Sequence, residues 1–244
     1  MKKIYFKSAF VLGGSSTVAK SICKKLAENG CKKFHLVCRN PDANKEFTQK
    51  LRSYYRAEVS EESNDLLLNN SLLNDFKPKV DFFDIYIIAP GYIGNNDLAN
   101  SNSKEALKIN SVNYGGIIPW LIEIMNEKRI QSKGSLWVFS SVASDRGRPS
   151  NYHYGASKAA LSIFCEGLLL RCINKPFSVR VIKAGYISTP MALGAPKYLC
   201  TSPDKIASIL MNKPYKRGIE YLPWWWNLIL FVVRRLPSFL AAKL

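Results

Sequence analysis

The chain has 244 residues, of which 47% are apolar and 22% charged, and this balance excludes a disordered chain. The modest numbers of 14 Gly and 12 Pro exclude a collagen-like or low-complexity chain. Lys and Arg outnumber Asp and Glu by 35 to 18, giving a net charge of +17, which favours a phosphate-bearing partner such as nucleic acid, an anionic membrane or a phosphorylated substrate.

Five short apolar runs alternate with helical patterns along the chain. The runs cover residues 6–12, 34–38, 85–89, 136–139 and 179–182, and the helical patterns cover 17–29, 103–130 and 154–173. Strands that alternate with helices predict an α/β fold with a doubly wound parallel sheet. We expect one such domain over residues 1–212, followed by a separate C-terminal segment over 213–244. Residues 40–80 are polar and show no clear pattern.

The six cysteines have neither the dense spacing of a secreted disulfide scaffold nor a CxxC pair. We therefore expect reduced cysteines within the core and a cytoplasmic protein. With only two histidines in the chain, we expect no metal site.

The first motif joins the first strand to the first helix. The turn reads Gly13-Gly14-Ser15-Ser16, and the helical pattern begins at Thr17. A glycine turn at a helix N-terminus offers free backbone N–H groups and the positive end of the helix dipole, which suits a pyrophosphate. Because the full GxGxxG pattern is absent, an ordinary strand-to-helix turn stays the alternative.

Arg39 directly follows the second apolar run. In dinucleotide-binding folds an acid at this position binds the ribose 2′-hydroxyl, whereas an arginine accommodates a 2′-phosphate. The absence of an acid here favours NADPH over NADH. A solvated surface arginine is the alternative.

The strongest motif combines Ser141 with Tyr154 and Lys158. The phenol and the ammonium stand four residues apart, on one face of a helix. A nearby positive charge stabilises a phenolate and brings the pKa of a tyrosine towards the working range of an acid or base. A serine at the end of the preceding strand could hydrogen-bond a substrate oxygen. A YxxxK spacing alone is usually structural, but the serine thirteen residues upstream makes the set specific.

Over about residues 5–210 the sequence resembles the short-chain dehydrogenases and reductases, which have the Rossmann fold. The residues that carry this likeness are the GGSS turn, Asn113, Ser141, Tyr154, Lys158, Ala184-Gly185 and Thr189. In that family the tyrosine transfers the proton, the lysine lowers its pKa and holds the nicotinamide ribose, the serine orients the carbonyl, and the asparagine supports a water relay. The resemblance therefore implies NADPH or NADH as the cofactor and the catalytic set Asn113, Ser141, Tyr154 and Lys158.

The same resemblance implies where the cofactor binds. The residues concerned are Gly13, Gly14, Ser15, Ser16, Thr17, Val18, Arg39, Ala89, Pro90, Gly91, Tyr154, Lys158, Gly185, Ile187 and Thr189. The sequence departs from the family pattern TGxxxGxG, since Thr17 and Ala19 replace its second and third glycines, and Ala89-Pro90-Gly91 replaces its NNAG.

In these departures, and in the long motif from Ser140 to Gly155, the sequence resembles a narrower group of the family, the decaprenylphosphoryl-2-keto-ribose reductases. That resemblance implies a polyprenylphosphoryl 2-keto-pentofuranose substrate, an arabinofuranose donor lipid as product for the cell envelope, and a flavin-dependent oxidase that makes the ketone. Arg146 and Arg148 are then candidates for the substrate phosphate, because arginine recognises phosphate bidentately. Loop solvation is the alternative for both.

The C-terminal segment contains three consecutive tryptophans at the start of an apolar run, Trp224 to Val233, which Arg234 and Arg235 end. Tryptophan prefers the membrane–water interface, and ten residues are too few to cross a bilayer. We expect an amphipathic segment that binds peripherally at the inner face of the cytoplasmic membrane, where the basic charge meets anionic lipid. A buried helix or an oligomer contact is the alternative.

Two further functions stay open at this point. One is a short-chain reductase of a soluble or acyl ketone, and the other is a non-catalytic binding protein on a Rossmann scaffold. No recognition motif for nucleic acid is present, so we expect no nucleic-acid partner. A homo-oligomer is possible, as in many members of the resembled family.

Overall fold

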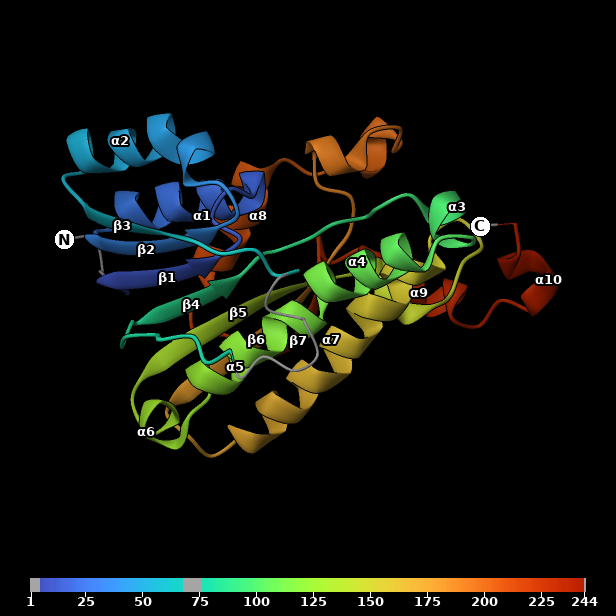
Figure 1. Ribbon diagram of the computed structural model, residues 1–244. Coiled ribbons are helices and arrows are strands. Elements are labelled where there is room, and N and C mark those ends of the chain that lie inside the picture. The colour runs from blue at the N-terminus through green and yellow to red at the C-terminus, as the bar shows by residue number, and fades with distance from the viewer. Residues whose placement is uncertain (1–4, 68–75, 244) are drawn as a thin grey trace.

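The computed structural model describes residues 5–67 and 76–243, and a parallel sheet of seven strands forms the centre of that part of the chain (Figure 1). The strand order is β3-β2-β1-β4-β5-β6-β7. The strands are β1 (Ser8–Leu12), β2 (Lys33–Cys38), β3 (Glu58–Ser63), β4 (Ile85–Ile88), β5 (Gly134–Ser141), β6 (Phe177–Ala184) and β7 (Gly218–Leu222). The order reverses direction between β1 and β4, where a doubly wound sheet opens a crevice.

Helices cover both faces of the sheet. α1 (Thr17–Glu28), α2 (Lys45–Ser53) and α8 (Pro203–Asn212) pack on one face, while α5 (Ile118–Ile124) and α7 (Tyr152–Arg171) pack on the other, with α4 (Ser103–Asn113) against α7. The remaining short helices are α3 (Asn96–Ala99), α6 (Glu127–Ile130), α9 (Trp226–Val233) and α10 (Ser238–Ala241), with 3-10 turns η1 (Pro41–Asn44), η3 (Gly115–Ile117), η4 (Val142–Asp145), η5 (Pro190–Ala192) and η6 (Lys197–Leu199). The predicted α/β fold is therefore confirmed.

The sequence periodicities explain the two cores. In β1 the side chains of Ala9 and Val11 join one core cluster, and those of Phe10 and Leu12 join the other, because successive side chains of a strand point to opposite faces. In α1 the buried residues Val18, Ile22 and Leu26 recur every four positions along one side of the helix. All five predicted apolar runs form strands of the sheet.

The helical pattern predicted over 103–130 is interrupted rather than continuous. α4 ends at Asn113, and η3 and α5 follow it. At Gly116 an added Cβ would lie 2.4 Å from the carbonyl oxygen of Leu66, so the chain approaches another backbone closely there. Pro119, at the start of α5, cannot donate the hydrogen bond that a continuous helix would need.

Two strands were not predicted from the sequence, because charged residues interrupt their apolar pattern. β3, at the edge of the sheet, has a single buried residue, Val59. β7 contains the buried acid Glu220, which accepts hydrogen bonds from Arg180 of β6 and from Lys216. β7 follows the boundary predicted at residue 212 and pairs with β6 in register, so the sheet includes the chain as far as Leu222.

The C-terminal segment continues from β7 and stays attached to the domain. α9 packs through Trp226 and Leu230 onto Val142 of η4, and both α9 and α10 lie towards the end of the sheet where the strands finish (Figure 1). Within residues 5–67 and 76–243, no helix is long and apolar enough to cross a membrane. Five of the six cysteines are buried, Cys200 is partly exposed, and all six are free thiols.

The contact between Gly185 and Trp226 gives a test of this packing. A Cβ added at Gly185 would lie 1.7 Å from the indole Nε1 of Trp226, so Gly185→Ala must displace a buried ring. We expect Gly185→Ala to lower the melting temperature. Gly167→Ala should raise it slightly, because the helical Gly167 has open space around it and alanine favours the helix by about 0.5–1 kcal/mol.

The same measurement in a Trp226→Ala background identifies the cause. If the two residues clash, the loss caused by Gly185→Ala should largely vanish once the ring is gone. An equal loss in both backgrounds would contradict this packing.

Candidate active site

A cleft of about 490 Å³ opens at the carboxyl ends of the strands. Its walls come from the turns that follow β1, β2, β3, β4, β5 and β6, together with the first turns of α1 and α7. This is the edge at which open α/β sheets bind their ligands. The fold therefore brings segments that are far apart in the sequence to one site.

The glycine turn after β1 is shaped by close backbone approach. Gly13 has a φ of +81°, and an added Cβ would lie 2.7 Å from the backbone nitrogen of Pro90. Only glycine avoids both the strain and the clash at this position. Gly14 has a different role from the one predicted: it packs against Leu36 of β2, where an added Cβ would meet the Leu36 Cβ at 3.0 Å, and it does not line the cleft.

The first turn of α1 is suited to an anion. The side chain of Ser16, at the N-cap, makes no capping hydrogen bond, and the first turn contains no acid. Ser15, Ser16, Thr17 and Val18 all line the cleft. Backbone N–H groups of a first helical turn have no partner within the helix, so they and the helix dipole can hold a pyrophosphate here. On these grounds the residues present fit a dinucleotide.

The ends of β2 and β3 form the far part of the cleft. Arg39 lies exposed at the end of β2, as predicted, and lines the cleft. Asn64, Asp65 and Leu66, which follow β3, also line it, and sequence reasoning missed them because β3 itself had no recognisable pattern. Only the polar run after a strand could have indicated them.

The turn after β4 is fixed from behind by Asn113. Its side chain donates to the carbonyl oxygens of Tyr92 (2.7 Å) and Ile109 (2.8 Å) and accepts from the backbone N–H of Tyr92 (3.0 Å). Asn113 is fully buried and does not line the cleft, whereas Ala89, Pro90 and Gly91 do. The structure thus places the Asn113 side chain behind the wall of the cleft rather than inside it.

Ser141, Tyr154 and Lys158 meet at the centre of the cleft, as the motif predicts. Ser141 ends β5, and its hydroxyl accepts a hydrogen bond from the N–H of Ala143 at 3.1 Å. Tyr154 and Lys158 lie one turn apart near the start of α7. These two elements converge because the chain returns along α7 directly after the turn that follows β5.

Lys158 is the most deeply buried of the three. Its side chain is 2% exposed, and Nζ donates to the carbonyl oxygens of Pro90 and Phe139, each at 3.1 Å. Burial disfavours the charged form and lowers the pKa of Lys158 to about 8. The lysine therefore joins the ends of β4 and β5 while keeping most of its charge near neutral pH.

The charge relation expected between Lys158 and Tyr154 differs in the structure. Burial raises the pKa of Tyr154, and a hydrogen bond with Ser141 lowers it in part. The ammonium of Lys158 donates to two backbone carbonyl oxygens rather than to the phenol. With its pKa raised by burial, the phenol holds its proton near neutral pH.

The turn after β6 closes the other side of the cleft. Gly185, Ile187 and Thr189 line it, and Ile187 is held by a bridge to Thr201. Met191 and Ala192 of η5 also line it and were not predicted. Their signal in the sequence was weak, since η5 lies in a loop without periodicity.

The open end of the cleft carries polar groups that the protein itself leaves without partners. Arg148 lines the cleft. Its guanidinium makes no hydrogen bond or ion pair within the described residues. Asn151 also lines it, and its Oδ1 is buried without a partner. Arg146 does not line the cleft: its guanidinium donates to the carbonyl oxygens of Val233 (2.9 Å) and Arg234 (3.0 Å) instead.

A metal centre has no basis in the part of the chain that the structure describes. Those residues contain no group of three or more His, Cys, Asp or Glu side chains that could hold a metal ion.

Solved structures share this architecture at low sequence identity. A 7β-hydroxysteroid dehydrogenase superposes with a TM-score of 0.71 at 19% identity, covering 89% of this chain and 87% of that one. An NAD⁺-bound xylitol dehydrogenase gives a TM-score of 0.69 at 18% identity, covering 87% of this chain and 95% of that one. BdcA in complex with NADPH gives 0.68 at 17% identity, covering 88% and 91%. These likenesses show the fold.

Curated relatives extend the comparison to sequence. An uncharacterized oxidoreductase of Streptomyces coelicolor is 27% identical over 242 residues, covering 98% of this chain and 96% of its own length. An uncharacterized oxidoreductase of Mycobacterium tuberculosis is 25% identical over 239 residues, covering 96% and 95%. A 3-oxoacyl-[acyl-carrier-protein] reductase of Chlamydia trachomatis is 25% identical over 188 residues, covering 76% and 75%.

The family assignment follows from a match that spans most of the chain. Residues 7–197 match the short chain dehydrogenase family, and this range contains the glycine turn, Ser141, Tyr154 and Lys158. The protein belongs to the short chain dehydrogenase family.

Proposed function

We propose that the protein is an NAD(P)H-dependent reductase whose substrate is a polyprenylphosphoryl 2-keto-pentofuranose and whose product is the corresponding arabinofuranose donor lipid. The family supports the oxidoreductase chemistry. The lipid-linked keto-sugar is supported by one combination of features: unpartnered polar groups in the cleft lie near a C-terminal segment that exposes apolar side chains.

The side chains at the centre of the cleft divide the reduction between them. A nicotinamide cofactor held in the cleft would supply the hydride for the carbonyl carbon. Tyr154 donates its phenolic proton to the carbonyl oxygen, which completes the alcohol. The hydroxyl of Ser141 donates a hydrogen bond to the same oxygen as negative charge develops on it. The ammonium of Lys158 lies one helical turn away, where it can hold a ribose hydroxyl of the cofactor and stabilise the tyrosinate that remains.

The end of β2 favours NADPH. Arg39 is exposed and lines the cleft, and no acid stands at the end of this strand to bind a ribose 2′-hydroxyl. A guanidinium pairs well with a 2′-phosphate. We therefore propose NADPH as the preferred reductant.

The open end of the cleft suits a hydroxylated, phosphorylated substrate. A buried amide oxygen without a partner costs about 1–3 kcal/mol, and a sugar hydroxyl could donate to Oδ1 of Asn151. The free guanidinium of Arg148 could pair with the phosphate that joins sugar and lipid. Arg146 leaves this proposal, because its guanidinium already binds the end of α9.

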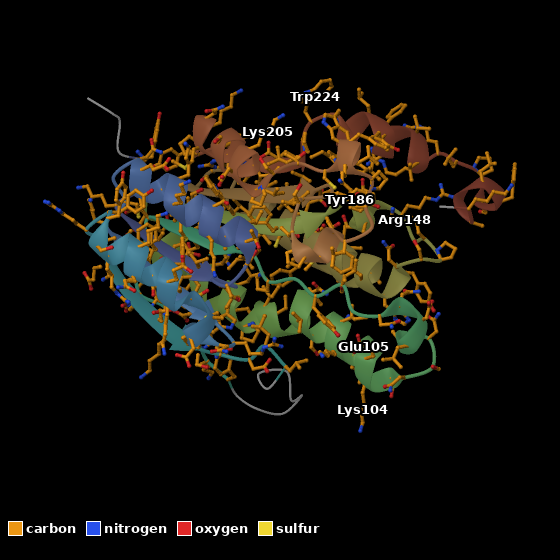
Figure 2. The ribbon with its side chains drawn as sticks, turned by 90° about the horizontal axis from the view of Figure 1, so that it is seen from above. Lys104, Glu105, Arg148, Tyr186, Lys205 and Trp224 are labelled. Atoms are coloured by element: carbon orange, nitrogen blue, oxygen red, sulfur yellow. The ribbon has the colours of Figure 1, made fainter. Side chains whose placement is uncertain are left out.

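The C-terminal segment supplies a surface for the lipid. Trp226 and Leu230 face the domain, whereas the exposed apolar face of α9 consists of Leu228, Phe231 and Val232, together with Trp224 in the turn before the helix. Trp224 is 72% exposed and points away from the molecule (Figure 2). A spacing of three and four residues places Leu228, Phe231 and Val232 on one side of the helix. Arg235 lies just beyond the end of α9, and the chain carries a net charge of +17, so an anionic lipid surface is the occupant that matches this face.

The setting of the enzyme follows from this surface. We propose that it works peripherally at the inner face of the cytoplasmic membrane, where a flavin-dependent oxidase would deliver the ketone within the same lipid layer. A polyprenyl chain does not diffuse through water, so the substrate has to be met at the membrane.

An acyl ketone is the second candidate substrate. It is favoured by the two chlamydial 3-oxoacyl-[acyl-carrier-protein] reductases, each 25% identical to this chain. These relatives cover 77% and 76% of the chain, however, while the Streptomyces oxidoreductase covers 98% of it.

The rates at which the protein reduces the two candidate substrates distinguish between them. With NADPH, we expect purified protein to reduce a polyprenylphosphoryl 2-keto-pentofuranose in mixed micelles and to leave acetoacetyl-acyl carrier protein almost unchanged. Tyr154→Phe should lower the rate by about 10²–10⁴-fold, because it removes the proton donor, while the Kd for NADPH stays within about twofold. The measurement is the loss of NADPH absorbance together with analysis of the sugar product.

Faster reduction of acetoacetyl-acyl carrier protein than of the lipid-linked keto-sugar would contradict the proposed substrate but not the proposed reductase activity. If NADPH and NADH both fail to bind, the proposal as a whole is wrong, and the non-catalytic alternative replaces it.

The pKa of Lys158 predicts two effects in one pH range. Its folded pKa of about 8 lies below the value of 10.5 for an unperturbed lysine, so between pH 8 and 10.5 the unfolded chain binds more protons than the folded one. The free energy of unfolding of the wild type, measured relative to that of Lys158→Met, should therefore rise with pH in this range, by at most about 1.4 kcal/mol per pH unit. The rate of reduction should fall over the same range as the ammonium loses its proton.

Urea denaturation of wild type and Lys158→Met between pH 7 and 10 measures the first effect, since other titrating groups are common to both proteins. A difference in stability that does not change with pH would show that Lys158 keeps its charge throughout.

Vesicle binding tests the exposed apolar face of α9. We expect the protein to sediment with vesicles of phosphatidylcholine containing 30% phosphatidylglycerol, and the double variant Trp224→Ser, Phe231→Ser to lose at least tenfold in affinity. The control is Tyr54→Ser, Phe82→Ser, which removes two exposed aromatic rings elsewhere on the surface. Equal losses in both variants, or no binding by the wild type, would count against a lipid surface.

A further inference from the structure

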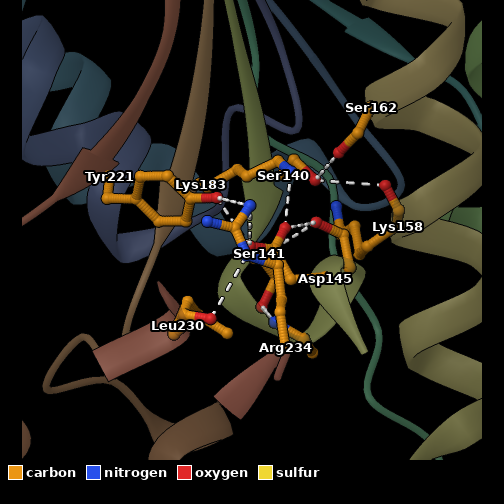
Figure 3. A network of polar contacts seen from close by, with 11 residues as sticks. Ser140, Ser141, Asp145, Lys158, Ser162, Lys183, Tyr221, Leu230 and Arg234 are labelled. Carbon is orange, nitrogen blue, oxygen red and sulfur yellow. Dashed lines mark hydrogen bonds and ion pairs between the residues drawn. The ribbon is translucent and has the colours of Figure 1, made fainter. Parts of the chain in front are cut away.

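A buried carboxylate outside the reacting groups holds together three parts of the fold. Asp145 is the last residue of η4, and its side chain is 1% exposed. Its Oδ1 accepts from Nζ of Lys183 at 2.5 Å, and its Oδ2 accepts from the hydroxyl of Tyr221 at 2.6 Å (Figure 3). Nη1 of Arg234 lies 3.7 Å from Oδ2 and donates to the Tyr221 hydroxyl at 3.4 Å.

Each partner of this carboxylate comes from a different element. Lys183 belongs to β6 and Tyr221 to β7, while Arg234 directly follows α9. The neighbouring Arg146 donates to the carbonyl oxygens at the end of α9. Asp145 and Arg146, which are consecutive in the chain, therefore both bind the C-terminal segment. Asp145 pairs with the charge of Arg234, and Arg146 donates to backbone carbonyl oxygens.

The same turn begins at the catalytic serine. η4 follows Ser141 directly, and inside it the Ser144 hydroxyl donates to the Ser141 carbonyl oxygen at 2.6 Å. Trp226 and Leu230 of α9 pack on Val142, the first residue of the turn. Asp145, whose carboxylate is anchored to β6, β7 and the residue after α9, thus lies only four positions after Ser141, whose hydroxyl faces Tyr154.

The proposed reaction does not account for this arrangement. Asp145 does not line the cleft, so it touches neither the cofactor site nor the substrate end. A carboxylate removed from water is costly unless charges and hydrogen bonds surround it, and Asp145 has two cations and a phenol around it. Removing one partner would let the turn move until the carboxylate finds water.

We propose that Asp145 is a positioning residue for Ser141, and that Arg234 couples the placement of the C-terminal segment to it. The inference rests on the proposed role of Ser141 in the reduction and is independent of the identity of the substrate. Through this network, the segment that carries the exposed apolar face of α9 also sets the geometry at the reacting groups.

Arg234 and Arg235 provide a matched pair for the test. Both are arginines at the end of α9, but Arg235 donates to the carbonyl oxygen of Phe231 and lies over its ring, with no contact to Asp145. The full chain is labelled with ¹³C at the ζ carbon of tyrosine, and Tyr154→Phe identifies the resonance of Tyr154. Its chemical shift at pH 7.5 reports the hydrogen bond between the phenol and Ser141, and Ser141→Ala gives the value without that bond.

We expect Arg234→Ala to move the Tyr154 resonance at least halfway to the Ser141→Ala value, and Arg234→Lys to restore most of the shift. Arg235→Ala should leave it unchanged. In the Ser141→Ala background, Arg234→Ala should add nothing further, because its effect passes through Ser141. Tyr221→Phe, which keeps the ring and removes one hydrogen bond to Asp145, is the second variant should Arg234→Ala fail to fold.

An unmoved resonance in a folded Arg234→Ala or Tyr221→Phe protein would overturn the proposal. So would an equal displacement with and without Ser141, since that would indicate a general structural change. The readout needs no substrate, so failure to reduce a lipid-linked sugar and failure of this coupling can be told apart.

Discussion

The arrangement of the site depends on the two hydrogen bonds that the ammonium of Lys158 donates. It is nearly removed from water and donates to one backbone carbonyl after β4 and another within β5. These strands are neighbours in the sheet, beside the point where the strand order reverses. One side chain from α7 therefore ties a helix to two strand ends. Its position fixes Tyr154 one turn earlier on the same helix, and burial lowers its pKa because the charged form is disfavoured away from water.

The sequence predicts most of this site because its chemistry depends on local spacing. The glycine turn and the pair Tyr154 and Lys158 are short-range patterns, and the apolar runs identify five of the strands that carry them. Contacts that depend on distant partners cannot be read from local spacing. The hydrogen bonds of Asn113 to Tyr92, and those of Arg146 to the end of α9, join residues 21 and 87 positions apart.

Charge also conceals structure from sequence reasoning. β7 reads as a polar connection because Glu220 interrupts its apolar residues, yet that acid is neutralised by Arg180 of the adjacent strand. β3 is concealed in the same way by three glutamates on an edge strand. Asp145 was visible as part of a motif, but its burial among Lys183, Tyr221 and Arg234 required the strands and α9 to be assembled first.

The buried pair of Arg180 and Glu220 has a consequence for how the C-terminal part of the chain can be studied. Arg180 also donates to the carbonyl oxygens of Leu210 and Lys213, so one guanidinium joins β6, β7 and the end of α8. A truncation that removes β7 would leave the buried guanidinium of Arg180 without its carboxylate partner. Breaking a buried ion pair in this way typically lowers the free energy of unfolding by about 3–5 kcal/mol. Shortened proteins would report on the collapse of a sheet edge, whereas single substitutions on the outer side of α9 leave that edge whole.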